Sequence, residues 1–207
     1  VVAEYARRER IPLFFAASSS TQFLHHQENP YTFSKCVSEE ILQLYHKIYQ
    51  LEYHMLYFYN VYGPREADYG EYSTVVRAFK KCVEKDEPLR IFGSGKKQRD
   101  FTHIHDVIDG ILQLLTTKNK PKNVHLGSGN PISIMDVAKA FGHSIVHEFD
   151  KEGEAEVTEA QNPYIEAQYD VISYIKKWKS DFEEERILHN VNKDLRKVEK
   201  KYAKIDS

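Results

Sequence analysis

Leu13-Phe14-Phe15-Ala16-Ala17, followed by Ser18-Ser19-Ser20, is the stretch that decides the fold class of this 207-residue chain. Five apolar residues in succession predict a strand buried on both faces of a parallel sheet, and the serines mark its end. Pro30 begins a predicted long helix, because the apolar residues that follow step by four, four, three and four. These residues are Phe33, Val37, Ile41, Leu44 and Ile48.

On both sides of this unit, strand-like and helix-like segments alternate along the chain. A first helix is predicted to end near Arg10, where clustered arginines suit the negative end of the helix dipole. Further helices are predicted over residues 75–83, 104–115 and 134–141, and strands over 55–59, 89–92 and 123–126. Alternation of this kind predicts an α/β layered fold.

The C-terminal third differs from the rest in composition. Residues 148–170 contain eight acidic residues and one basic residue, so we expect a solvated stretch rich in loops. Beyond it, apolar residues step by three, four, three and four within a polar segment, which predicts an amphipathic helix with a narrow seam: Leu188, Val191, Leu195, Val198 and Tyr202. We expect this seam to pack on its own domain, and self-association is the alternative.

Composition excludes several classes of protein. There are 31 acidic and 29 basic residues, whereas nucleic-acid and anionic-membrane binders carry a basic excess. The longest apolar run has seven residues, far fewer than the roughly 20 that span a bilayer, and the charged N-terminus does not resemble a signal peptide. Cys36 and Cys82 lack metal or redox spacing, so we expect a reducing, cytoplasmic location.

Histidines offer no convincing metal site. The candidates are His25-His26, His103 with His105, and His143 with His147. None of them joins a cysteine or carboxylate set at the spacing that metal ligands need, so we expect no metal ion.

Tyr31 and Lys35 could carry acid–base chemistry. They lie at positions i and i+4 at the start of the long helix and therefore share one face. A nearby ammonium group favours the phenolate form of a tyrosine. Ser20 follows a buried strand, at the edge where open α/β sheets place ligands, and its hydroxyl could hydrogen-bond a substrate oxygen. Together the three side chains could move a proton on and off an alcohol.

Several separated motifs resemble, in the correct order, the NAD-dependent epimerase/dehydratase family of extended short-chain dehydrogenases and reductases. They are Ser18-Ser19-Ser20, Asn29-Pro30-Tyr31-Thr32-Phe33-Ser34-Lys35, Tyr59-Asn60-Val61-Tyr62-Gly63-Pro64-Arg65, Pro88-Leu89-Arg90-Ile91-Phe92-Gly93-Ser94-Gly95, Gln98-Arg99-Asp100-Phe101-Thr102-His103 and Leu126-Gly127-Ser128-Gly129. The resemblance covers about residues 1–175. It implies the C-terminal part of a Rossmann-like parallel sheet, a small α/β substrate-binding domain and a C-terminal amphipathic helix.

The resemblance also implies roles for the residues near the first strand. Tyr31 would be the catalytic acid and base, and Lys35 would favour its phenolate and hold the nicotinamide ribose of NAD. Ser20 would hydrogen-bond the reacting sugar oxygen. Ser18, Tyr31 and Lys35 would contact the cofactor.

The substrate would be a nucleotide sugar. Asn60 would contact it, Arg99 would pair with its diphosphate, and residues 72–79 would lie near the base. Lys151, in Lys151-Glu152-Gly153-Glu154-Ala155, stands where the family has a second diphosphate-binding arginine, so only a point charge remains there.

Within the family, the residues after Ser20 favour epimerisation. Dehydratases place Asp-Glu directly after the catalytic serine or threonine, whereas Thr21-Gln22-Phe23 stands here. We therefore expect 4-epimerisation of a UDP-hexose through a 4-keto intermediate, with a dehydratase or reductase of the same family as an alternative.

The N-terminal cofactor half of the family has no counterpart in this chain. The first glycine is Gly63, so the phosphate-binding glycine loop is missing. We expect the isolated chain to be inactive or incomplete, because the NAD-binding half is absent or lies on a separate chain. The other hypothesis is that the chain is a non-catalytic nucleotide-sugar-binding or assembly module. We expect three parts. Residues 1–64 form the catalytic part of an incomplete Rossmann-like domain, residues 65–178 mix the remainder of that domain with the substrate-binding domain, and residues 179–207 form the polar amphipathic helical tail. Family members commonly form homodimers through the Tyr31 helix and the one near residue 75.

Overall fold

The computed structural model describes residues 1–24, 29–67 and 73–202, and it has the α/β fold that the sequence predicts. In chain order its elements are α1 (Val2–Glu9), β1 (Leu13–Ser18), α2 (Ser20–Phe23), α3 (Pro30–Tyr49), β2 (Tyr53–Phe58), β3 (Asn60–Tyr62), α4 (Val75–Glu84), β4 (Leu89–Phe92), β5 (Gln98–His103), α5 (Ile104–Thr116), β6 (Asn123–Leu126), β7 (Pro131–Ser133), α6 (Ile134–Phe141), β8 (Ile145–Glu148), β9 (Val157–Thr158) and α7 (Val171–Tyr202). All the predicted helices and strands are present, whereas helix α2 and strands β3, β5, β7, β8 and β9 are additional.

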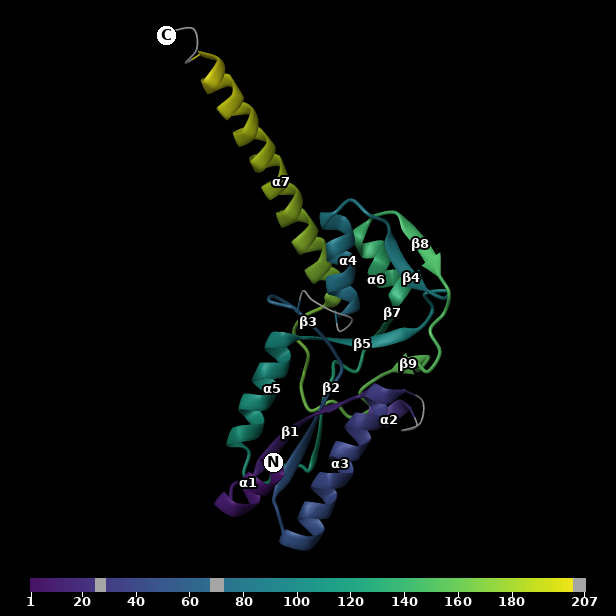
Figure 1. Cartoon of the computed structure of the whole chain (residues 1–207), viewed down its shortest axis with the longest axis vertical. Helices are drawn as coiled ribbons and strands as arrows, with labels where there is room; N and C mark the ends of the chain where they lie inside the picture. The colour runs from purple at the N-terminus through teal and green to yellow at the C-terminus, as the bar shows by residue number, and fades with distance from the viewer. Residues whose placement is uncertain (25–28, 68–72, 203–207) are drawn as a thin grey trace.

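A three-stranded parallel sheet in the order β1-β2-β6 forms the first layer. The side chains of β2 alternate between its two faces. Met55 and Tyr57 pack in the cluster with Leu42 of α3, and Leu56 packs with Leu114 of α5, so helices cover both faces (Figure 1). This sandwiching explains why Tyr53–Tyr57 of β2 are all buried, including His54.

The prediction that the first strand is buried on both faces is wrong. Only the last two residues of β1 are buried, and Ala16 is exposed. Within the described residues β1 is an edge strand that pairs with β2, so its side chains have cross-strand neighbours on one side only.

The apolar stripe predicted on the long helix is present, but it faces away from the sheet. Phe33, Ile41, Leu44 and Ile48 are between 45% and 56% exposed, whereas Leu42 on another face of α3 is buried. The helix therefore has one face on the sheet and a second, apolar face on the surface.

A second body holds the remaining strands. β3, β5, β7 and β9 form one sheet, β4 and β8 form a pair, and α4 and α6 pack on them (Figure 1). Its core includes Phe79, Ile91, Phe141 and Ile175. The acidic stretch is loop-rich as predicted, with β9 as its short strand.

Helix α7 starts earlier than the predicted tail and extends out of the body (Figure 1). Val171 and Ile175 are in the second core, and Trp178 and Phe182 pack against it, so the predicted boundary at residues 178–179 falls inside one helix. The prediction that the seam packs on its own domain is wrong for Leu188 and Val191, which are exposed beyond the last packed residue, Phe182.

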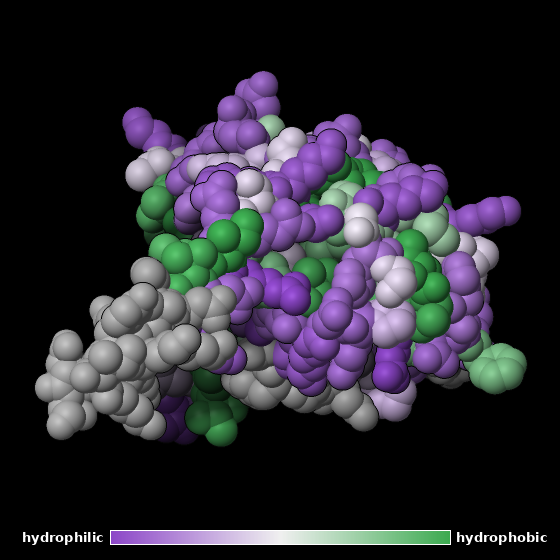
Figure 2. Space-filling model, turned by 90° about the horizontal axis from the view of Figure 1, so that it is seen from above, coloured by the Kyte–Doolittle hydropathy of each residue, from purple (hydrophilic) through white to green (hydrophobic). Residues whose placement is uncertain are grey.

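The surface seen along the long axis is largely hydrophilic, with separate hydrophobic patches (Figure 2). Across residues 1–24, 29–67 and 73–202, no helix is both long and apolar enough to cross a membrane.

Candidate functional site

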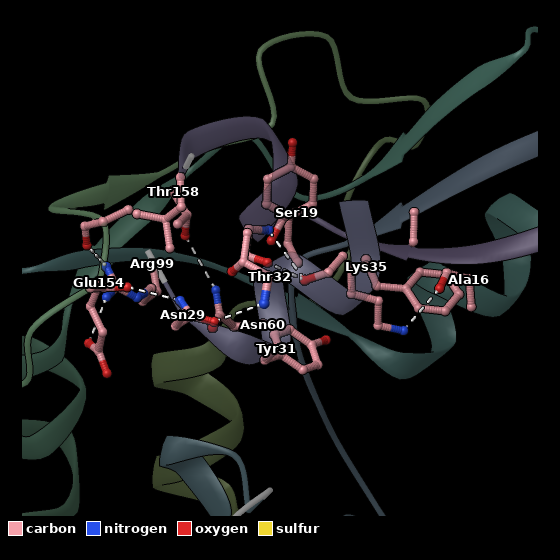
Figure 3. A pocket seen from close by; sticks show the side chains of 18 residues that line it. Ala16, Ser19, Asn29, Tyr31, Thr32, Lys35, Asn60, Arg99, Glu154 and Thr158 are labelled. Atoms are coloured by element: carbon pink, nitrogen blue, oxygen red, sulfur yellow. Dashed lines mark hydrogen bonds and ion pairs between the residues drawn. The ribbon is translucent and has the colours of Figure 1, made fainter. Parts of the chain in front are cut away.

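A cavity of about 440 Å³ lies where β1 and β2 end, between the start of α3 and the loop before β9 (Figure 3). This is the edge at which parallel α/β sheets bind ligands. The lining residues come from both bodies: Ala16, Ala17, Ser18, Ser19, Ser20, Leu24, Asn29, Tyr31, Thr32, Lys35, Phe58, Tyr59, Asn60, Arg99, Gly153, Glu154, Ala155 and Thr158. Every predicted site residue except Lys151 is among them.

The serines approach the cavity from the end of β1. Ser18 is its last residue, and its Oγ lies 2.9 Å from Oγ of Ser20. The backbone N–H of Ser20 also donates to Ser18 Oγ at 3.3 Å. Ser18 therefore orients the first residue of α2, which is the predicted catalytic serine.

Asn29 and Pro30 determine where α3 begins. Asn29 is the N-cap, and its side chain accepts a hydrogen bond from the N–H of Thr32 at 2.8 Å, while Pro30 takes the first helical position. The amide nitrogen of Asn29 also donates to the carbonyl of Gly153 at 3.1 Å. One residue thus starts the helix and ties it to the loop across the cavity.

Tyr31 and Lys35 share the helix face predicted from their spacing (Figure 3). Tyr31 is half-exposed, and its ring centroid lies 5.8 Å from Nζ of Lys35. Lys35 Nζ donates to the carbonyl of Ala16 at 3.4 Å, a long hydrogen bond. Both polar ends therefore remain at the cavity wall.

Asn60 and Arg99 form the opposite side. Asn60 Nδ2 donates to the carbonyl of Asp100 at 3.2 Å and to Thr158 Oγ1 at 3.4 Å. Arg99 donates to the carbonyl of Ala155 at 2.8 Å and to the carboxylate of Glu154 at 3.1 Å. These contacts hold the guanidinium group at the cavity.

Lys151 does not join them. It is exposed, and its ammonium group lies 4.0 Å from the ring centroid of Phe92. Gly153, Glu154 and Ala155, which follow it in the same motif, line the cavity instead.

Sequence reasoning missed the carboxyl group of Asp100, which is fully buried. Its Oδ1 accepts from the N–H and Oγ of Ser128, and its Oδ2 accepts from the N–H groups of Gly129 and Ala160 at 2.9 and 3.0 Å. Asp100 therefore holds two chain segments beneath the residues that line the cavity. Its place beside Arg99 within a recognised motif was the available signal.

Tyr59, which lines the cavity, is unsuited to act as a base. Burial raises its pKa to about 12, with the charge of Asp100 as a second cause. Its hydroxyl pairs with Nδ1 of His125 at 3.0 Å, and burial lowers the pKa of that histidine.

Within the described part of the chain, no group of three or more histidine, cysteine or acidic residues could hold a metal ion. His25-His26 and Tyr72 lie outside the described residues.

Known proteins resemble this chain in sequence and in fold. The model of the NAD dependent epimerase/dehydratase family matches residues 2–127, more than half of the chain. A putative UDP-glucose 4-epimerase from Methanocaldococcus jannaschii is 35% identical over 133 residues, or 62% of this chain and 43% of that protein. A UDP-glucuronate 4-epimerase from Thermodesulfobacterium geofontis is 34% identical over 53% of this chain and 32% of that protein. The chain thus spans less than half the length of these relatives.

Solved structures share the fold. UDP-glucose 4-epimerase from Thermotoga maritima, with UDP-glucose, has a TM-score of 0.74 at 22% identity and covers 88% of this chain and 67% of that one. UDP-glucuronic acid 4-epimerase from Bacillus cereus, in complex with UDP-glucuronic acid and NAD, has a TM-score of 0.68 at 25% identity and covers 86% of this chain and 65% of that one.

Proposed function

Because the chain belongs to the NAD dependent epimerase/dehydratase family, we propose that it carries the catalytic and substrate-binding part of a nucleotide-sugar 4-epimerase. The proposed substrate is a UDP-hexose. The observation that carries the proposal is that Ser20, Tyr31, Lys35, Asn60 and Arg99 all line one cavity, although they come from segments far apart in the sequence.

Tyr31 is the proposed acid and base. Its phenolate oxygen would accept the proton of the sugar 4-hydroxyl group, and the phenol so formed would return the proton after the keto sugar has rotated in the site. Lys35, one helical turn further on, would favour the phenolate. Ser20, oriented by Ser18, would hydrogen-bond the same sugar oxygen.

The residues present fit the nicotinamide end of NAD. Ala16 and Ala17 leave room at the end of β1, and the ammonium group of Lys35 can donate to ribose hydroxyls. Bound NAD supplies the reversible oxidation of the sugar carbon. The chain has no glycine-rich phosphate loop, so we propose that strands carrying one pair with the open edge of β1.

Arg99 is the proposed partner of the substrate diphosphate. A guanidinium fork suits bidentate pairing with phosphate oxygens. Glu154 and Ala155 hold the guanidinium group before substrate arrives, so little side-chain entropy remains to be lost on binding.

A dehydratase or decarboxylase is the second candidate, because a UDP-N-acetyl-alpha-D-glucosaminuronate decarboxylase from Bacillus cytotoxicus is 29% identical over 113 residues. Such chemistry needs a carboxyl group beside the sugar. Among the described lining residues the carboxylate is Glu154, and it is paired with Arg99. This pairing favours epimerisation.

The test is conversion of UDP-glucose to UDP-galactose with NAD⁺. We expect the chain alone to bind UDP-glucose with little or no turnover, and the chain joined to the N-terminal cofactor half of a relative to convert it. Binding without turnover in the joined protein would favour a non-catalytic sugar-nucleotide module. Release of water from UDP-glucose, or of carbon dioxide from UDP-glucuronic acid, would favour the second candidate. Absence of both binding and turnover would contradict the proposal.

We further propose that the exposed apolar face of α3 forms a homodimer interface. Helix α4, which the resemblance implicates, packs with α6 in the second body and away from α3. Leu44→Glu with Ile48→Glu should raise the dimer dissociation constant at least about 100-fold, since each such side chain contributes about 1.5 kcal/mol or more when buried.

Sedimentation of the wild-type chain and the double variant measures this effect. Gln43→Glu, an exposed polar position on the same helix, is the matched control and should leave the dissociation constant unchanged. A wild-type chain that stays monomeric at all concentrations would refute the interface.

A further inference from the structure

Glu39 is a buried carboxyl group that the proposed acid–base chemistry does not use. It is 9% exposed and lies on α3 two turns after Tyr31 and one turn after Lys35. Its Oε1 is 2.7 Å from Oγ1 of Thr21, and its Oε2 is 3.3 Å from the hydroxyl of Tyr57. A side chain of the catalytic helix thus contacts the residue that follows Ser20.

The hydroxyl of Thr21 has more acceptors around it than it can serve. Its Oγ1 is 2.9 Å from the carbonyl oxygen of Ser18 as well as 2.7 Å from Glu39. A threonine hydroxyl has one proton and a carbonyl oxygen can only accept, so an ionised Glu39 would leave one of these short contacts without a proton.

A neutral Glu39 satisfies every contact. Its own proton, on Oε1, is donated to Thr21, whose proton is then free for the carbonyl of Ser18, while Oε2 accepts from Tyr57. Gln22 Nε2, at 3.3 Å from Thr21 Oγ1, takes the remaining lone pair. A hydroxyl group that donates one hydrogen bond and accepts two has its full hydrogen-bonding capacity satisfied.

We infer that Glu39 is held as a neutral carboxylic acid and that in this form it positions α2, and with it Ser20, against the helix that carries Tyr31. The catalytic meaning of Ser20 rests on the proposed function, whereas the protonation of Glu39 does not. Glu39 is a positioning residue, because it contacts Thr21 and Tyr57 and does not line the cavity.

Burial of the carboxyl group acts in the same direction. It raises the pKa of Glu39 more strongly than the hydrogen bonds to Thr21 and Tyr57 and the charge of Lys35 lower it. Burial also raises the pKa of Tyr57 on β2, so that group keeps its proton and donates. The other titratable neighbours are Cys36, whose pKa is raised by burial and by Glu39, and the exposed Glu40.

Infrared spectroscopy of the whole chain tests the protonation. We expect the band of a protonated carboxyl group at pH 7 in the wild type and in Glu40→Gln, and its loss in Glu39→Gln. If Glu39→Gln leaves the carboxyl bands of protonated groups unchanged at pH 7, Glu39 is ionised and the inference fails.

Stability gives a second readout. The neutral form stabilises the fold at acidic pH, and this contribution declines as pH rises from 4.5 through the raised pKa, because the unfolded chain releases its proton first. The urea midpoint of the wild type should therefore fall with rising pH relative to Glu39→Gln. A midpoint that falls equally in both would overturn the assignment.

Amide hydrogen exchange tests the positioning. The N–H groups of Gln22 and Leu24 donate within α2. Gln has a donor and an acceptor like the neutral acid, so Glu39→Gln should keep their protection, whereas Glu39→Ala should reduce it at least about tenfold. If the alanine variant does not fold, Thr21→Val takes its place and should reduce the protection of these N–H groups to a similar extent. Equal protection in the wild type and Thr21→Val would refute the positioning role, whatever the outcome of the turnover assay.

Discussion

Tyr31→Phe should lower kcat for the proposed epimerisation by about 10²–10⁴-fold, the usual contribution of a positioned acid–base group. The substitution removes the phenolic oxygen that would take up and return the sugar proton, and it leaves the ring in place. Because the ring and its half-exposed position at the cavity are kept, substrate binding should change little. The measurement is turnover and UDP-glucose affinity of the joined protein, compared with its unsubstituted form.

Tyr49→Phe is the matched control. It makes the same change on the same helix at 51% exposure, against 50% for Tyr31, but it lies at the far end of α3 from the cavity. We expect near-normal turnover for Tyr49→Phe. Near-normal turnover for Tyr31→Phe as well would show that another group moves the proton.

Asp100→Asn should lower the free energy of unfolding by about 1–3 kcal/mol. Each carboxylate oxygen accepts at least two hydrogen bonds, and an amide nitrogen can accept none. In one orientation the amide nitrogen faces the N–H groups of Gly129 and Ala160, and in the other it faces the N–H and the hydroxyl of Ser128. Because a hydroxyl can turn to accept, at least one backbone N–H loses its acceptor in either orientation, at a cost of about 1–3 kcal/mol. Urea unfolding of the chain measures the loss.

The same substitution at an exposed position separates the loss of the Asp100 hydrogen bonds from the effect that any change of aspartate to asparagine has on stability. Asp109→Asn on α5 should change the free energy of unfolding by no more than about 0.5 kcal/mol. Asp100→Asn should also weaken UDP-glucose binding, because the carboxylate holds Ala160, two residues after the cavity residue Thr158, and Asn60 donates to the backbone carbonyl of Asp100. Equal stability of the two variants would mean that the Asp100 network contributes little.

Much of the architecture could be predicted from local sequence. Some elements could be predicted because the pattern of apolar residues along the chain is typical of a helix or of a buried strand, and this pattern depends only on residues close in sequence. These elements are the helices α3, α4, α5 and α6 and the strands β2, β4 and β6. The polar strand β5 could not be found this way, since it owes its pairing to β3, β7 and β9, which are distant in sequence.

The residues of the candidate site could likewise be predicted only in part from the sequence. Ser20, Tyr31, Lys35, Asn60 and Arg99 were predicted because each belongs to a short motif. Lys151 was named from the same motif pattern, yet it lies outside the cavity that its neighbours Gly153–Ala155 line. A sequence motif identifies the loop, whereas the path of its backbone in the fold determines which of its side chains reaches the cavity.

By itself, the sequence determined the α/β class, the order of the principal elements and the residues that could move a proton, because these follow from spacing along the chain. Only the tertiary structure decided that the stripe on α3 is exposed and that Glu39 and Asp100 support the site. The physical reason is that burial and hydrogen bonding depend on what packs against a side chain. For Glu39 those partners are Thr21 and Tyr57, and for Asp100 they include Ser128 and Ala160, all of which only folding brings together.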